Sequence, residues 1–221
     1  MKVIAHIQND YTEKFGVPRQ GGRVSSVKSR LIFLPEYRVK EAFRGLEGYS
    51  HIWLLWEFSL AQRETWSPTV RPPKLGGNER IGVFATRSPF RPNPLGLTCV
   101  TLEEIVTEGK EAPYLIVGGA DLMNGTPVYD IKPYLPYADA YPDAKAGFTA
   151  HLDDRLLEVE IPVKELEKLP PSSQKALFDV LAQDPRPGYQ EDPDRIYGMS
   201  FAGKNVRFRV SEGKLTVLEI L

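Results

Sequence analysis

SHIWLLWEFSL, residues 50–60, is an apolar run rich in aromatic and long aliphatic side chains. Its length and the glycine just before it, Gly48, are typical of a β-strand, and the nearly continuous apolar pattern predicts a strand buried on both faces. Further short strands are predicted at residues 3–7, 95–106 and 114–118, with turns rich in glycine and proline between them. The sequence therefore predicts a mainly β domain, which is either a sandwich or a barrel.

The segment GVFATRSPFRPNPLGLT, residues 82–98, carries three prolines and two arginines. Each proline fixes its own φ and pushes the preceding residue toward extended backbone, so this loop is stiff. A guanidinium on a stiff loop loses little entropy when it binds a carboxylate or a phosphate, and its fork can bind two oxygens at once. Arg87 and Arg91 therefore predict an anionic ligand, although a proline-rich connector without a ligand is the alternative.

A local excess of positive charge surrounds this loop. Residues 71–93 contain five basic residues, among them Arg71 and Lys74, against the single acid Glu79. The whole chain of 221 residues has 28 basic and 29 acidic residues and a net charge of −1, which argues against indiscriminate binding of nucleic acid. Any polyanion is therefore expected to bind to a patch.

The sequence lacks the residues that several kinds of functional site require. The three histidines, His6, His51 and His151, are not at metal-ligand spacing and the only cysteine is Cys99, so neither a metal site nor an internal disulfide is predicted. No glycine-rich dinucleotide turn and no nucleophile elbow occur, which argues against a Rossmann domain and a serine hydrolase. The sequence shows no signal-peptide pattern and no apolar run long enough to span a bilayer, so a cytoplasmic protein with no membrane partner is predicted.

The composition changes at about residue 140. Before it, apolar residues on one face predict a short helix at residues 39–45. After it, residues 163–183 have a helical pattern, and the end of the chain alternates as a β-hairpin does. We predict two domains, a mainly β domain over 1–142 with a net charge of +2 and a small α+β domain over 143–221 with a net charge of −3.

Six strings of the sequence resemble motifs of one family, the TsaA-like (TrmO) tRNA methyltransferases. They are FGVPRQ at 15–20, LEGYSHIWLLW at 46–56, VRPPKLGG at 70–77, the stiff loop at 82–98, DLMNGTPVYDIKPYLPY at 121–137 and DPRPGY at 184–189. The resemblance covers most of residues 1–140 and includes the C-terminal part found in longer bacterial members. It implies a single-sheet β-barrel domain followed by the small α+β domain.

The resemblance also implies an activity, which is the transfer of a methyl group from S-adenosylmethionine to N6 of N6-threonylcarbamoyladenosine at position 37 of threonine tRNA. Family members are dimers with their sites near the subunit boundary, so a homodimer is implied. By motif match, the cofactor-binding residues are Pro18, Arg19, Gln20, Ser59, Leu60, Arg87, Leu97, Asn124, Gly125, Thr126 and Pro127. The residues predicted to bind RNA are Arg71, Lys74, Arg91 and Arg186. The family commonly has histidine in place of Ser59 and often aspartate in place of Asn124, and both differences predict weaker cofactor binding.

Methyl transfer agrees with the lack of a candidate nucleophile. S-Adenosylmethionine carries its own leaving group, so the protein mainly has to align the reacting atoms and exclude water. The nitrogen that is methylated must lose a proton, and Asp130, oriented by Lys132 or Tyr134, is the candidate base. The alternative for Asp130 is a structural role as the partner of Lys132.

Two other functions remain open from the sequence. One is a non-catalytic RNA-binding module whose arginine- and proline-rich loops bind the anticodon backbone. The other is a barrel that senses the cofactor without binding RNA. The RNA-binding module would not take up S-adenosylmethionine, whereas an enzyme would. The cofactor sensor would not bind RNA, whereas an enzyme would.

Overall fold

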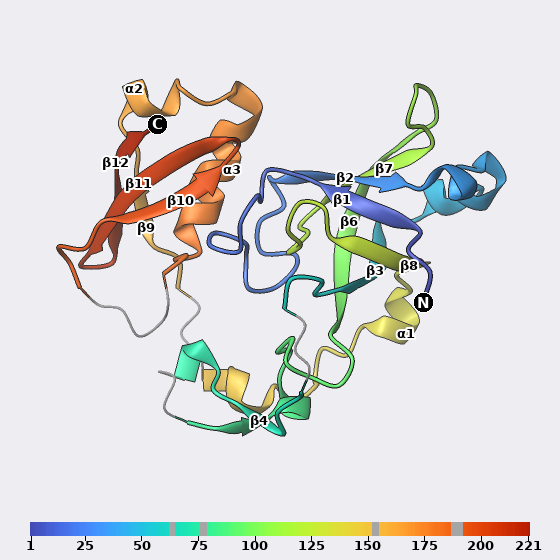
Figure 1. Ribbon diagram of the computed structural model, residues 1–221, viewed down its shortest axis with the longest axis horizontal. Helices are drawn as coiled ribbons and strands as arrows, with labels where there is room; N and C mark the ends of the chain where they lie inside the picture. Colours follow the sequence, from blue (N-terminus) through green and yellow to red (C-terminus); the bar gives the residue numbers. More distant parts are fainter. Residues whose placement is uncertain (62–64, 76–78, 152–154, 187–191) are drawn as a thin grey trace.

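The computed structural model describes residues 1–61, 65–75, 79–151, 155–186 and 192–221. Figure 1 shows a barrel, a smaller domain beside it, and a small lobe around β4 that projects from the barrel. The strands are β1 (Ala5–Gln8), β2 (Lys28–Phe33), β3 (His51–Glu57), β4 (Thr69–Val70), β5 (Ile81–Gly82), β6 (Leu95–Val106), β7 (Tyr114–Gly118), β8 (Pro127–Pro133), β9 (Glu158–Glu160), β10 (Tyr197–Phe201), β11 (Lys204–Ser211) and β12 (Lys214–Ile220). The α-helices are α1 (Pro136–Asp139), α2 (Val163–Leu166) and α3 (Pro171–Ala182). The 3-10 helices are η1 (Pro35–Tyr37), η2 (Lys40–Phe43), η3 (Leu46–Gly48), η4 (Pro73–Leu75), η5 (Val83–Ala85) and η6 (Gly147–His151).

The first domain is a closed barrel of six strands in the order β1-β2-β7-β6-β3-β8, and every pair in it is antiparallel. Closure leaves no free sheet edge, which explains how strands as short as β1 are stable. The single-sheet barrel that the resemblance implied is therefore confirmed. The sandwich, which the strand pattern alone allowed, is excluded.

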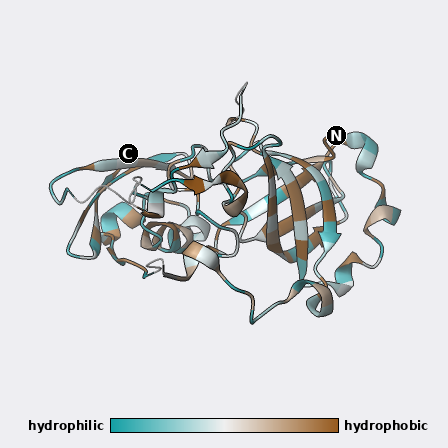
Figure 2. Cartoon of the chain, turned by 90° about the horizontal axis from the view of Figure 1, so that it is seen from below, coloured by the Kyte–Doolittle hydropathy of each residue, from teal (hydrophilic) through white to brown (hydrophobic). Residues whose placement is uncertain are grey.

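The central strand β3 alternates in burial, which corrects the prediction that it is buried on both faces. Ile52, Leu54 and Trp56 point into the barrel, whereas Trp53 and Leu55 lie on its outer face and are half-buried. A closed barrel has one interior, so successive side chains of a strand must point in and out. Figure 2 shows the apolar residues of the barrel strands in brown.

Two strands of the barrel, β2 and β8, were not predicted, and one predicted helix is different. The segment of β2 carries Lys28 and Arg30, and prolines stand at both ends of β8, so neither segment has the apolar run that predicts a strand. In β2, Leu31 and Phe33 are buried in the barrel core. The helix predicted at residues 39–45 is only the short 3-10 turn η2, in which Phe43 is buried.

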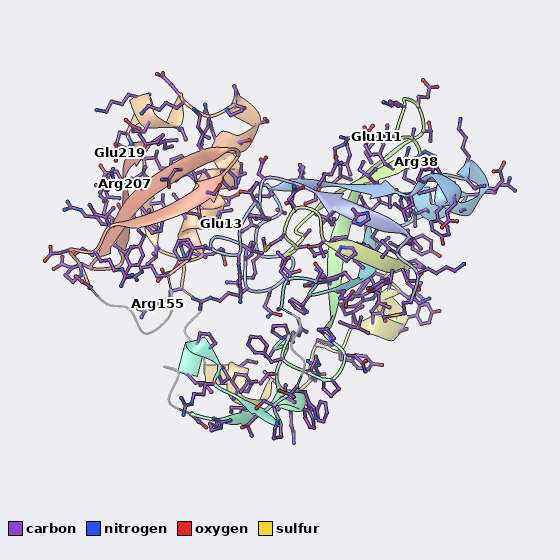
Figure 3. All side chains as sticks on the ribbon, viewed as in Figure 1. Glu13, Arg38, Glu111, Arg155, Arg207 and Glu219 are labelled. Carbon is purple, nitrogen blue, oxygen red and sulfur yellow. The ribbon has the colours of Figure 1, made fainter. Side chains whose placement is uncertain are left out.

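The second domain packs α3 against a four-stranded sheet in the order β10-β11-β12-β9, with β9 parallel to β12. Arg207 and Glu219 pair across neighbouring strands of this sheet, and both are labelled in Figure 3. The helical pattern and the terminal hairpin predicted from the sequence are confirmed. This part of the chain is therefore α+β, as predicted.

The connection between β1 and β2 joins the two domains. Tyr11, Val24 and Val27 belong to the apolar core of the C-terminal domain rather than to that of the barrel. Oε1 of Glu13, a residue labelled in Figure 3, accepts a 2.6 Å hydrogen bond from the backbone N–H of Ser200 in β10. The loop that carries the FGVPRQ motif is therefore held from both sides.

Candidate functional site

Three connections of the barrel meet at one of its ends. The register places the end of β3, the start of β6 and the start of β8 together, because Trp56 pairs with Gly96 on one side and with Val128 on the other. The end of β1 lies at the same end, because His6 pairs with Pro127. The β1–β2, β3–β6 and β7–β8 connections therefore emerge side by side, and all eleven residues implied to bind the cofactor lie on them or at the adjoining strand ends.

Gln20 and Arg87 bring two of these connections into contact. The Nη1 of Arg87 donates a 2.5 Å hydrogen bond to Oε1 of Gln20, although 67 residues separate them. Both side chains are exposed, and so is Arg19 beside them, whereas Pro18 is buried. The Nη2 of Arg19 donates a 2.6 Å hydrogen bond to the backbone oxygen of Arg186, so the C-terminal domain also contacts this end of the barrel.

Asp121 lies near these groups and is hydrogen-bonded to the barrel wall. Its Oδ1 accepts a 2.7 Å hydrogen bond from the Thr98 hydroxyl, whose oxygen accepts a 3.0 Å bond from the buried Trp56 indole. Burial raises the pKa of Asp121 above its usual range, against the opposing effects of Thr98, the backbone N–H of Gly21 and the charge of Arg87. A carboxylate kept in a partly desolvated place next to an arginine is typical of functional sites.

The turn at residues 124–127 forms the third side of the site. The backbone N–H of Asn124 donates to Tyr11 O and that of Gly125 to Ile7 O, both at 2.8 Å, which fixes the turn to β1 and its extension. Oδ1 of Asn124 accepts a 3.1 Å bond from the Asn9 backbone. Gly125 has a φ of +83°, which favours glycine, and Thr126 is buried ahead of Pro127.

Ser59, Leu60 and Leu97 supply exposed surface at the same end. The backbone N–H of Phe58 donates to Pro94 O, which holds the residues after β3 against the stiff loop. Leu60 is 82% exposed and Leu97 is 58% exposed. Apolar side chains so open to water are an available contact surface for a ligand or a partner chain.

The structure does not bring the candidate catalytic trio together at this end. Asp130 and Lys132 lie on the outer face of β8 and form a 2.9 Å ion pair with each other, which is the contact that the structural alternative expects. Tyr134 lies at the opposite end of the barrel, where its N–H donates to His51 O and its ring packs on Trp53. Of the three, Asp130 is nearest the site in sequence position, three residues after Pro127.

The residues predicted to bind RNA differ in exposure and in their contacts within the protein. Arg71 is exposed next to β4, and Nη1 of the half-buried Arg91 donates to Thr86 O at 3.0 Å. Lys74 lies in η4, but its side chain is outside the described residues. Arg186 is largely buried and makes two 2.8 Å hydrogen bonds to the carboxylate of Asp184, so its charge is already neutralised. Arg186 is therefore better placed to brace the loop of Arg19 than to bind a phosphate.

Sequence reasoning missed Asp121, Thr98 and Gly21 as site residues. The available signal was an acidic residue just after the apolar strand 114–118 and the glycine pair that ends it. A charge at the end of a buried strand needs partners, and only the tertiary structure shows that they are the Thr98 hydroxyl and the Gly21 N–H.

Among the residues that the structure describes, no group of three or more histidine, cysteine, aspartate or glutamate side chains could hold a metal ion. In the same part of the chain, none of the helices has the length and apolarity that crossing a membrane requires.

The fold and the site define a class of protein: a closed β-barrel that presents arginine-bearing loops at one end and carries a small α+β domain. The family model described as tRNA-methyltransferase O N-terminal domain matches residues 6–140, and the TrmO C-terminal domain model matches residues 151–221. The chain therefore belongs to the TrmO family.

Relatives over the full length support this assignment. A tRNA (adenine(37)-N6)-methyltransferase of Escherichia coli (strain K12) is 44% identical over 225 residues, which cover 98% of this chain and 95% of the relative. A putative S-adenosylmethionine-dependent methyltransferase, RcsF, of Pseudomonas aeruginosa PAO1 is 42% identical over 89% of this chain and 86% of its own length. The crystal structure of TrmO from Pseudomonas aeruginosa superimposes with a TM-score of 0.78 at 33% identity, covering 100% of this chain and 96% of that chain.

Proposed function

We propose that this chain is an S-adenosylmethionine-dependent tRNA methyltransferase that methylates N6 of N6-threonylcarbamoyladenosine at position 37 of threonine tRNA, in the cytoplasm. The observation that carries the proposal is the meeting of three motif-bearing connections at one barrel end, joined by the Arg87–Gln20 and Thr98–Asp121 hydrogen bonds. The names of the relatives supply the reaction class. The threonylcarbamoyl group rests on the sequence resemblance alone.

The residues at the barrel end fit the charges and shape of S-adenosylmethionine. Arg87 and Arg19 are exposed guanidinium groups that would bind its carboxylate. Asp121 supplies negative charge in a partly buried position, which favours a neighbouring cation such as a sulfonium. The open side chains of Leu60 and Leu97 would cover the apolar faces of the nucleoside.

When bound, the cofactor supplies an activated methyl group, so no protein nucleophile is required. The chain itself binds and orients the reactants and excludes water. The hydrogen bond between Arg87 and Gln20 holds two loops together before the ligand binds. Asp130 stays the proposed acceptor of the N6 proton, and Lys132 its positioning partner. Tyr134 has no direct part at this end of the barrel.

The test is methyl transfer from labelled S-adenosylmethionine to two matched threonine tRNAs, one with and one without the threonylcarbamoyl group. We expect label only on the modified tRNA. Equal labelling of both would leave an adenine-N6 methyltransferase but reject the finer substrate. RNA binding without any transfer, and without heat of cofactor binding in calorimetry, would instead support a non-catalytic RNA-binding module.

We also propose a homodimer in which the outer face next to the site is covered by a second copy. Leu55 pairs with Leu97 on β6, and Leu97 keeps more than half of its surface exposed, so an apolar strip reaches the cofactor end. Sedimentation equilibrium is expected to give twice the chain mass of 24.9 kDa. A single-chain mass at micromolar concentration would reject this assembly.

A further inference from the structure

Two aromatic rings stand together on the surface of the lobe around β4. Trp66 is 50% exposed and Phe84 is 72% exposed, yet their ring centroids are only 6.0 Å apart and the ring planes differ by 25°. Single exposed aromatic residues are common on protein surfaces. Two large rings that stack on each other and still face water form a flat apolar surface that is available to a ligand.

The backbone of the lobe forces these rings outward. Thr69 pairs with Gly82 in the β4–β5 ladder, and the next bond, from Val83 N–H to Pro68 O at 2.9 Å, continues it toward Trp66. Val83 is buried and anchors η5, so its neighbour Phe84 must point away from the interior. The ladder therefore fixes the backbone that carries the platform of Trp66 and Phe84.

Two arginines lie on the same β4–β5 ladder as the aromatic platform, past its other end. Arg71 follows β4 directly and is exposed, and Arg80 is held at the start of β5 by a 2.8 Å bond from its Nε to the Thr69 hydroxyl. Farther along the chain, the Thr86 and Ser88 hydroxyls accept backbone N–H bonds within the stiff loop, and Arg91 donates to the Thr86 backbone oxygen. These bonds hold Arg91 in place. Flat exposed rings and guanidinium groups on one small lobe are the elements that bind single-stranded nucleic acid, because bases stack on the rings while phosphates pair with the cations.

We propose that Trp66 and Phe84 form a stacking platform for one unpaired base of the RNA substrate, and that Arg71 and Arg80 bind the flanking phosphates. The proposal deepens the function proposed above and rests on its RNA substrate. The excess of positive charge favours RNA over an apolar protein as the partner, because residues 71–93 carry five basic residues and one acid. The platform would specify an unpaired base by its shape and would not distinguish one base from another.

The test uses an anticodon stem-loop RNA with 2-aminopurine placed in turn at each unpaired position. We expect quenching at one position on binding to the wild-type protein. The double variant Trp66→Ala/Phe84→Ala should lose that quenching and bind the RNA about 5- to 150-fold more weakly, which corresponds to one lost base stack. Trp66→Phe keeps a ring and should retain most of the affinity. S-Adenosylmethionine binding should be unchanged in all variants.

The matched control is Tyr49→Ala, an exposed aromatic residue just before β3 at the opposite end of the barrel, which should bind RNA as the wild type does. Wild-type RNA affinity in the double variant would overturn the platform while leaving the methyltransferase intact. Loss of the dimer mass in the double variant at unchanged RNA affinity would assign the rings to a contact between copies and would also overturn it. Ring-dependent quenching without any methyl transfer would support the platform and reject the proposed enzyme.

Discussion

Replacing Asp121 by asparagine is expected to lower the affinity for S-adenosylmethionine at least tenfold, a loss of about 1.4 kcal/mol or more. The carboxylate accepts hydrogen bonds from the Thr98 hydroxyl and the Gly21 N–H, and it lies within electrostatic range of Arg87. Asparagine keeps an oxygen for Thr98 but removes the negative charge that would face the sulfonium, while the Arg87–Gln20 hydrogen bond is retained. Calorimetric titration of the cofactor measures the effect.

The same substitution should not reduce stability, which separates a site role from a structural one. Burial raises the pKa of Asp121 in the folded state, so the charged carboxylate opposes folding once the pH exceeds that pKa. The free energy of unfolding of the wild type should therefore fall as the pH rises from the usual carboxyl pKa through the raised pKa of folded Asp121. Asp121→Asn should not show this fall, and it should melt at the same or a higher temperature at pH 7. A lower melting temperature together with unchanged cofactor affinity would contradict the assignment.

Glu111→Gln is the matched control for this experiment. Glu111 also pairs with an arginine, Arg30 at 2.9 Å, but it lies on the β6–β7 connection at the opposite end of the barrel, as Figure 3 shows. Its exposed ion pair contributes little to stability. Cofactor affinity in this variant should equal that of the wild type.

Replacing Gly96 by alanine is expected to destabilise the barrel by about 3 kcal/mol, which lowers the melting temperature by roughly 6–12 °C in a domain of this size. A Cβ at this position would lie 2.2 Å from Cε2 of Trp56. The indole cannot move freely, because it is buried and its Nε1 donates to Thr98. Displacing it would also disturb the Thr98–Asp121 bond, so cofactor binding should weaken together with stability.

Gly82→Ala provides the comparison, because Gly82 has a φ of −55° and no atom lies within 4 Å of the Cβ position. Its effect should stay within about 0.5 kcal/mol, as for an ordinary surface change. Thermal denaturation of both variants measures the difference. Equal melting temperatures for the two variants would show that the Trp56 contact is not tight in solution.

Much of the fold could be predicted from local patterns. The strands at 95–106 and 114–118 agree with β6 and β7, because runs of apolar and β-branched residues between turn residues specify strands locally. The pattern failed where tertiary context overrides composition. In β2 the charged residues Lys28 and Arg30 face outward while Leu31 and Phe33 fill the barrel, and in β8 the terminal prolines concealed a strand that pairs on both sides.

The candidate site shows the same division. Stiffness and charge identified Arg87 and Arg91 as presented groups, since proline restricts the backbone wherever it occurs. The sequence also predicted Asp130 as a base oriented by Lys132 or Tyr134, and the structure pairs Asp130 with Lys132 on β8 but places Tyr134 at the opposite end of the barrel. Distances between residues far apart in sequence depend on strand register, which local composition does not encode.

The amino-acid sequence by itself determined the family, the strand-forming segments and the stiff arginine loops, because these depend on residue identity and on local backbone restriction. Only the tertiary structure decided that three connections meet at one barrel end, that Asp121 accepts a hydrogen bond from the Thr98 hydroxyl, and that Trp66 stacks on Phe84. Barrel closure and strand pairing decide these contacts because they bring together residues that are up to about a hundred positions apart, and that pairing is a property of the whole sheet.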